Sequence, residues 1–250
     1  ATVVDKVKDA DIVIFVGGIS PDLEGEEKHF VNCPGFSGGD RTSIELPQVQ
    51  RDILKALKKA GKKVVFVNCS GSAVALVPEM ESCDAILQAW YPGQAGGLAV
   101  ADVLFGDFNP SGKLPVTFYK STDQLPDFED YSMKNRTYRY MTEAPLFPFG
   151  YGLSYTTFDI SKGRLNKKTI SAGQGLNFKV NVKNTGKYDG AEVIQVYVRK
   201  VDDAEGPIKS LRAFRRVPLK AGETCVVSID LLPTTFEFFD PTTNTMRIMP

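Results

Sequence analysis

Short apolar runs alternate with helical patterns over residues 11–105, and this alternation constrains the fold more than any other feature of the chain. Three apolar runs are typical of strands, at residues 11–16, 63–68 and 85–90. Three segments carry helical patterns, at residues 47–60, 73–80 and 96–105. The alternation predicts an α/β domain with a mostly parallel sheet flanked by helices. Because the strand runs are apolar throughout, we expect both faces of the sheet to be covered.

The helix predicted at residues 47–60 has clear signals at both ends. Pro47 suits a first helical position, where its missing N–H costs nothing, and Gly61 suits a left-handed cap. The spacing of the apolar side chains predicts one buried stripe along this helix, formed by Val49, Ile53, Leu54 and Leu57.

The alternation of strand and helix patterns ends by residue 120. Residues 121–157 are rich in proline and aromatic residues and lack periodicity, which indicates an ordered connection. Alternating apolar and polar residues then predict strands at 176–182, 191–199 and 224–231. We therefore predict three parts: an α/β domain at 1–120, a connection at 121–157, and an all-β fibronectin type III-like sandwich at 158–250.

Charge and composition exclude several classes of function. Thirty basic residues balance thirty acidic ones, which argues against a nucleic-acid partner. No apolar stretch approaches the roughly 20 residues of a membrane helix. Gly17 and Gly18 follow the first strand, but neither a G-x-G-x-x-G nor a Walker pattern is present, so no nucleotide cofactor is expected. A single histidine, His29, argues against a metal site.

The cysteines and two glycosylation triplets leave open questions. Cys33, Cys69, Cys83 and Cys225 lack the C-x-x-C spacing of zinc and redox sites, so we interpret them as small buried hydrophobic residues. A bridge between Cys33 and Cys69 is the alternative. The triplets beginning at Asn68 and Asn135 match the acceptor pattern for N-glycosylation, which also arises by chance.

An acidic loop leaves the first predicted strand, at the end where open parallel sheets bind their ligands. It contains four carboxylates among apolar and aromatic neighbours: Asp22, Glu24, Glu26 and Glu27. A carboxyl group next to apolar surface or another carboxylate holds its proton more tightly, and such a group serves as a general acid near neutral pH. The alternative is an acidic loop exposed to solvent without a catalytic role.

Five strings of residues, in order along the chain, resemble the C-terminal domain of glycoside hydrolase family 3. They are GDRTSIELPQVQ at 39–50, AWYPGQAGGLA at 89–99, FGDFNPSGKLPVTF at 105–118, and RTYRY at 136–140 with PFGYGLSYTTF at 148–158. The likeness is nearest to the β-xylosidase and β-glucosidase branch that carries a fibronectin-like tail. It implies a further strand beyond residue 250.

The resemblance implies a retaining, exo-acting β-glycosidase that removes terminal sugars from oligosaccharides, as a β-xylosidase first and a β-glucosidase next. Its aspartate nucleophile would belong to an N-terminal (β/α)8 barrel, and its acid/base glutamate to the acidic loop. Matching the Glu-Gly pattern assigns that role to Glu24, with Glu26 second and Glu27 third. The chain alone would then be inactive, and the resemblance suggests a secreted or periplasmic location.

Other motif residues have structural interpretations. Asp40 and Arg41 suggest either an ion pair or an anchor that fixes the acidic loop to backbone oxygens. Trp90 lies at the end of a predicted strand, where it either packs in the core, which we favour, or lines a sugar subsite. A second hypothesis from another class is a non-catalytic structural or carbohydrate-binding module.

Overall fold

The computed structural model describes residues 2–25 and 33–249, and these fall into two compact units. Unit 1 comprises Ala1–Asp102, Val116–Arg136 and Thr142–Phe149, and unit 2 comprises Val103–Pro115, Thr137–Met141 and Gly150–Pro250. The domain boundaries expected at residues 120 and 157 stay a prediction.

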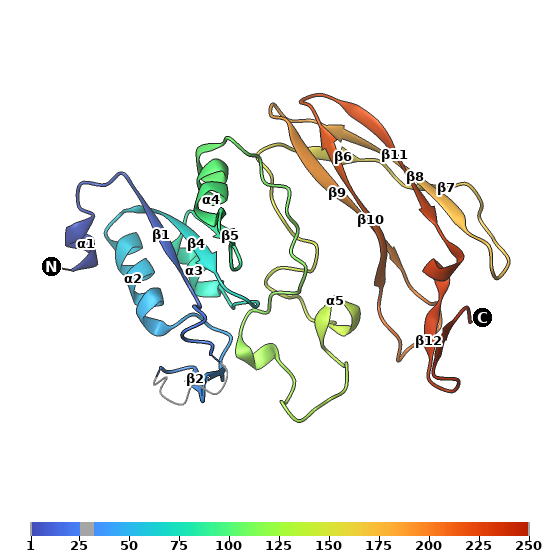
Figure 1. Cartoon of the computed structure of the whole chain (residues 1–250), viewed down its shortest axis with the longest axis horizontal. Helices are drawn as coiled ribbons and strands as arrows, with labels where there is room; N and C mark the ends of the chain where they lie inside the picture. The colour runs from blue at the N-terminus through green and yellow to red at the C-terminus, as the bar shows by residue number, and fades with distance from the viewer. Residues whose placement is uncertain (1, 26–32, 250) are drawn as a thin grey trace. The chain divides into compact units, whose positions relative to one another are not determined.

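Unit 1 is built on a parallel sheet of three strands in the order β1-β4-β5 (Figure 1). The strands are β1 at Ile12–Gly18, β4 at Lys63–Cys69 and β5 at Ala85–Gln88. Gly18 is opposite Cys69, and Asn68 is opposite Gln88, so the carboxyl ends of all three strands meet at one edge. The predicted parallel sheet is confirmed.

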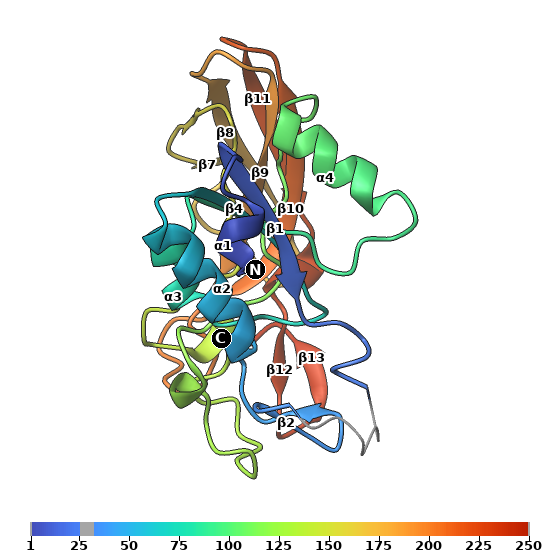
Figure 2. The ribbon, with the colours of Figure 1, turned by 90° about the vertical axis from the view of Figure 1, so that its left-hand side faces the viewer.

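Among the described residues of unit 1, one helix precedes β1 and one helix follows each of the three strands. They are α1 at Val3–Lys6, α2 at Gln48–Lys59, α3 at Val77–Ser82 and α4 at Gly96–Phe105, of which α4 continues into unit 2. Helix α2 packs against β4 and α3, and Figure 2 shows α2 and α3 on the same side of β1 and β4. Leu54 and Leu57 of α2 are fully buried there. Phe15 and Phe66 pack side by side on β1 and β4, with ring centroids 5.7 Å apart.

Four expectations for unit 1 were wrong in part. Alternate side chains of β1 point to solvent, since Ile12, Ile14 and Val16 are 47–65% exposed, so one face of this strand is uncovered among the described residues. Val49 lies on the exposed side of α2 rather than in its buried stripe. Pro47 is the cap residue before α2 and not its first helical residue, while Gly61 does adopt the left-handed conformation, with φ of 72°. Helix α3 begins at Val77, after an irregular segment, and not at residue 73.

Unit 2 contains an antiparallel sandwich, as predicted. One sheet pairs β10 with β9, and the other has the order β11-β8-β6 with β7 also on β8. The strands are β6 at Phe158–Ile160, β7 at Arg164–Leu165, β8 at Leu176–Asn184, β9 at Gly190–Val198, β10 at Ser210–Leu219 and β11 at Thr224–Leu231. Strands β12 at Phe238–Asp240 and β13 at Thr245–Arg247 form a hairpin.

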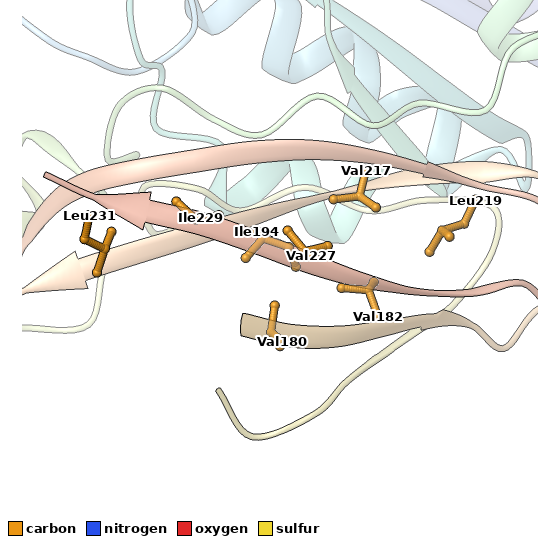
Figure 3. Close-up of a cluster of buried hydrophobic side chains, with 8 residues drawn as sticks. All are labelled: Val180, Val182, Ile194, Val217, Leu219, Val227, Ile229 and Leu231. Atoms are coloured by element: carbon orange, nitrogen blue, oxygen red, sulfur yellow. The ribbon is translucent and has the colours of Figure 1, made fainter. Parts of the chain in front are cut away.

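The core of the sandwich contains side chains from both sheets (Figure 3). Eight residues form it: Val180, Val182, Ile194, Val217, Leu219, Val227, Ile229 and Leu231. Ile194 comes from β9, and the other seven occur at every second position of β8, β10 and β11, the period expected when one face of each strand is buried.

Five shorter elements complete the described chain. They are β2 at Phe36–Ser37, β3 at Asp40–Arg41, α5 at Thr137–Tyr140, and two 3₁₀ turns at Thr122–Gln124 and Pro233–Phe236. Across residues 2–25 and 33–249, no helix is long and apolar enough to cross a membrane.

The described cysteines are all free thiols, so the Cys33–Cys69 bridge is not formed. Only Cys83 is buried, and burial raises the pKa of its thiol to about 11. The interpretation as buried hydrophobic residues therefore holds for Cys83 alone.

Candidate active site

The candidate site lies at the edge where β1, β4 and β5 end. Gly18 closes β1 with φ of 123°, a conformation that side chains disfavour. A Cβ atom on Gly18 would lie 1.9 Å from the carbonyl oxygen of Cys69, so only glycine allows the two strand ends to approach this closely. Ile19 then donates its N–H to that same oxygen at 2.8 Å.

Helix α2 fixes the exit of the loop through Gln50. The Gln50 side chain accepts a hydrogen bond from the Gly18 N–H at 2.8 Å and donates one to the Gly18 carbonyl at 2.7 Å. Both backbone groups at the end of β1 are thus satisfied by one amide, which sets the direction in which the acidic loop leaves the sheet.

Glu24 is the described member of the three predicted acid/base candidates. Its backbone is held in a turn, because the N–H groups of Leu23 and Glu24 both donate to the carbonyl of Ser20 at 3.0 Å. The Glu24 side chain is partly buried and lies close enough to Arg41 and Tyr91 to interact electrostatically with both. Glu26, Glu27 and His29 lie outside the described residues.

Arg41 anchors the far side of the acidic loop, as one of the two interpretations predicted. Its Nη1 donates to Ser72 Oγ at 2.8 Å and to the Ala73 carbonyl at 3.2 Å, and its Nε donates to the Ser43 carbonyl at 3.2 Å. These bonds connect β3 to the segment that follows β4. Burial lowers the pKa of the Arg41 guanidinium, while the Glu24 and Glu45 carboxylates oppose that shift. An arginine stays charged under these conditions, so a fixed positive charge lies beside Glu24.

Glu45 is a second carboxylate near Arg41, and no pattern in the sequence marks it as a site residue. Burial favours its neutral form, but hydrogen bonds from Ser43 and Thr122 outweigh burial and lower the pKa of Glu45 to about 2. Thr122 donates its N–H at 2.9 Å and its hydroxyl at 2.6 Å, and the Ser43 hydroxyl also donates. Because both oxygens are occupied and the group is ionised, Glu45 is suited to anchoring and not to donating a proton.

Tyr91 reaches the same site from the end of β5. Its ring packs over Gly71, where a Cβ atom would lie 2.6 Å from Cε2 of the ring. The pKa of the Tyr91 hydroxyl is raised, first because burial disfavours the phenolate and then because the Glu24 carboxylate lies nearby. The preceding residue, Trp90, has φ of 57° and packs edge-on against Phe118 with centroids 5.9 Å apart. Trp90 therefore packs within unit 1, as favoured.

A polar network lies behind this edge. Asn68 Nδ2 donates to Gln88 Oε1 at 2.6 Å, Gln88 Nε2 donates to Ser70 Oγ at 3.2 Å, and Ser70 Oγ donates to the Ser72 carbonyl at 2.9 Å. Asn68 is completely buried, so the folded chain does not offer it for glycosylation, whereas Asn135 is exposed.

Metal ligands do not gather at this edge. Within the part of the chain that the structure describes, no group of three or more histidine, cysteine, aspartate or glutamate side chains could hold a metal ion. The chemistry available to the described site is proton transfer and charge stabilisation by Glu24, Tyr91 and Arg41.

Comparison with known proteins identifies the family. Residues 1–155 match the family described as Glycosyl hydrolase family 3 C-terminal domain. This chain belongs to glycosyl hydrolase family 3. Residues 192–250 match the Fibronectin type III-like domain, in agreement with the sandwich of unit 2.

Relatives of this chain include a protein named as a xylosidase and one named as a glucosidase. The chain is 61% identical over 245 residues to a xylan 1,4-beta-xylosidase from Xylanibacter ruminicola, covering 98% of this chain and 28% of that protein. It is 42% identical over 241 residues to a periplasmic beta-glucosidase from Salmonella typhimurium, covering 91% of this chain and 30% of that protein. The chain thus spans less than a third of these two relatives.

Solved structures of the family share the fold. A β-glucosidase from Erythrobacter marinus has 36% identity and a TM-score of 0.84, covering 99% of this chain and 32% of that one. A β-glucosidase from Listeria innocua in complex with isofagomine has 31% identity and a TM-score of 0.80, covering 98% of this chain and 34% of that one.

Proposed function

We propose that this chain supplies the proton donor of a retaining, exo-acting β-glycosidase, with Glu24 as that donor. The observation that carries the proposal is the position of Glu24, a partly buried carboxylate at the carboxyl edge of a parallel sheet, flanked by Tyr91 and Arg41. The substrate is an oligosaccharide with a terminal xylose, or glucose as the second choice. The 61% identity to a xylosidase supports this order.

The other described glutamates near the sheet are less suited to the role. Glu45 is held ionised by Ser43 and Thr122. Glu79 is 1% exposed and pairs with Arg51 at 3.1 Å, between α2 and α3, where no sugar has access. Glu26 and Glu27 remain the second and third candidates in the same loop as Glu24.

Two carboxylates divide the work in a retaining glycosidase. In this proposal the nucleophile is an aspartate of an N-terminal (β/α)8 barrel, which attacks the anomeric carbon. Glu24 gives its proton to the leaving oxygen as the glycosidic bond breaks and a covalent glycosyl intermediate forms. Glu24, now ionised, removes a proton from the water that releases the sugar. Both steps need only proton transfer and nucleophilic attack, so no cofactor is required.

A chimera tests this assignment. This chain would replace the matching 245-residue region of the Xylanibacter ruminicola xylosidase, so that the active site has an N-terminal domain. Glu24→Gln should lower kcat/KM for xylosides with poor leaving groups by about 10²- to 10⁴-fold, the usual contribution of general acid catalysis. Dinitrophenyl xyloside, whose leaving group needs no proton, should be affected far less in the glycosylation step, and azide should restore turnover.

The non-catalytic alternative makes the opposite prediction. If the chain only stabilises a partner domain, Glu24→Gln changes the melting temperature of the chimera and leaves turnover intact for both classes of leaving group. Glu129→Gln, at an exposed position of unit 1, serves as a matched control for removal of one negative charge.

A further inference from the structure

Tyr91 is partly exposed, but both its backbone and its ring are constrained. It lies between Trp90, whose φ of 57° is unusual for a residue with a side chain, and Pro92, which restricts the backbone of the residue before it. Pro92 in turn packs on Gly96, where a Cβ atom would lie only 2.3 Å from the proline Cβ. The backbone that presents Tyr91 is therefore fixed on both sides.

The ring of Tyr91 is fixed as well. Gly71 leaves room for it, because a Cβ atom there would lie 2.6, 3.2 and 3.3 Å from Cε2, Cδ2 and Cζ of the ring. Gly71 follows directly on Ser70, which is completely buried and hydrogen-bonded to the Ser72 carbonyl. The ring thus packs against backbone that the polar network holds in place, while 45% of the residue stays exposed.

The Tyr91 hydroxyl is a hydrogen-bond donor, and the Glu24 carboxylate next to it is an acceptor. A phenol whose pKa is raised by burial and by Glu24 keeps its hydrogen at neutral pH. It can then donate one hydrogen bond to one carboxylate oxygen, which leaves the other oxygen free for a glycosidic oxygen or a water molecule. Arg41 commits its Nε and Nη1 to Ser43, Ser72 and Ala73, so its role beside Glu24 is mainly that of a fixed charge.

We propose that Tyr91 is the positioning residue of Glu24: its hydroxyl holds one carboxylate oxygen and thereby directs the other at the bond to be cleaved. This inference rests on the proposed role of Glu24. In addition, the segment after β5 then takes part in proton transfer through Tyr91. Gly71 contributes to this role because its lack of a side chain leaves space for the Tyr91 ring.

The test uses the chimera with the Xylanibacter ruminicola xylosidase. Tyr91→Phe keeps the ring and removes the hydroxyl, and we expect kcat for xylosides with poor leaving groups to fall on the order of 10- to 100-fold, as for loss of a hydrogen bond to a charged group. KM should change little. The alkaline limb of the kcat/KM profile should move to higher pH, because the ionised form of the general acid loses a donor. Tyr131→Phe, at a tyrosine that is 92% exposed, is the matched control and should leave all three quantities unchanged.

Two further variants separate positioning from packing. Gly71→Ala keeps the hydroxyl but displaces the ring, and should reproduce the effects of Tyr91→Phe. In a Glu24→Gln background, Tyr91→Phe should lower kcat no further, because a residue that acts through Glu24 then has no carboxylate to position.

The outcomes distinguish this inference from the proposed function. If Glu24→Gln leaves turnover of poor leaving groups intact, the role of Glu24 itself is wrong. If Glu24→Gln behaves as expected but Tyr91→Phe matches Tyr131→Phe, or lowers kcat equally in both backgrounds, Glu24 keeps its role and the positioning role of Tyr91 is wrong. Circular dichroism and melting curves of each variant confirm that it is folded, and the Tyr91→Phe arm alone decides if Gly71→Ala does not fold.

Discussion

The pKa of Glu45 leads to a prediction that can be measured on this 250-residue chain by itself. The pKa falls from 4.5 to about 2 on folding, a shift that corresponds to about 3 kcal/mol. The carboxylate is only partly buried, so solvent screening reduces its contribution to about 1–2 kcal/mol. Because the pKa is lowered in the folded state, this stability is present above the unfolded pKa and is lost as the pH falls toward 2.

We therefore expect Glu45→Gln to destabilise unit 1 by about 1–2 kcal/mol at pH 7 and by roughly half as much at pH 3. The assay is urea unfolding followed by the fluorescence of Trp90, the single tryptophan of the chain, which lies in the same unit as Glu45. Glu129→Gln, on an exposed loop of that unit, is the control for a lost charge. A free-energy difference between wild type and Glu45→Gln that is equal at pH 7 and pH 3 would refute the reasoning.

Three other predictions concern the same chain. The isolated chain should hydrolyse nitrophenyl xyloside negligibly compared with the chimera, and similar turnover by both would contradict the need for an N-terminal domain. Gly18→Ala should lower the free energy of unfolding, followed by Trp90 fluorescence, by at least about 2 kcal/mol, because the new Cβ would lie 1.9 Å from a carbonyl oxygen. The control is Gly97→Ala in α4, where a Cβ meets nothing within 4 Å, and it should be neutral or stabilising. Val182 is fully buried in unit 2, and Val182→Ala should lower the free energy of unfolding, measured by circular dichroism, by about 2 kcal/mol. Val226 is 64% exposed, so Val226→Ala should change that free energy little, and equal losses for the two variants would contradict the core assignment.

Strong local signals made much of the fold predictable. The helix at residues 96–105 and the strand at 224–231 have the predicted bounds, because their patterns are uninterrupted and their ends carry glycine or turn residues. Strand β10 was missed, since a bulge between Leu211 and Ala213 shifts its alternation and Pro218 is unusual in a strand. The exposure of Val49 was also not predicted, because the spacing of apolar residues identifies the buried side of a helix but not how far around the helix that side extends.

The candidate site was only partly predictable, for a different reason. The position of the acidic loop after an apolar strand indicated a candidate site, and the resemblance to the family then singled out Glu24 within it. Its neighbours, however, come from segments far away in the sequence. Tyr91 reaches the loop through the end of β5, and Thr122 reaches Glu45 across 77 residues. Only the three-dimensional arrangement of strand ends brings such residues together, so a local pattern in one sequence carries no trace of it.

The uncovered face of β1 has a practical consequence for anyone who purifies this chain. Ile12, Ile14 and Val16 form a row of branched aliphatic side chains open to water on a regular strand. Such a row recruits hydrophobic dyes and other protein molecules. A native sample should therefore enhance the fluorescence of an anilinonaphthalene dye before any denaturant is added, and replacement of Ile14 by threonine should weaken that signal and delay precipitation on concentration.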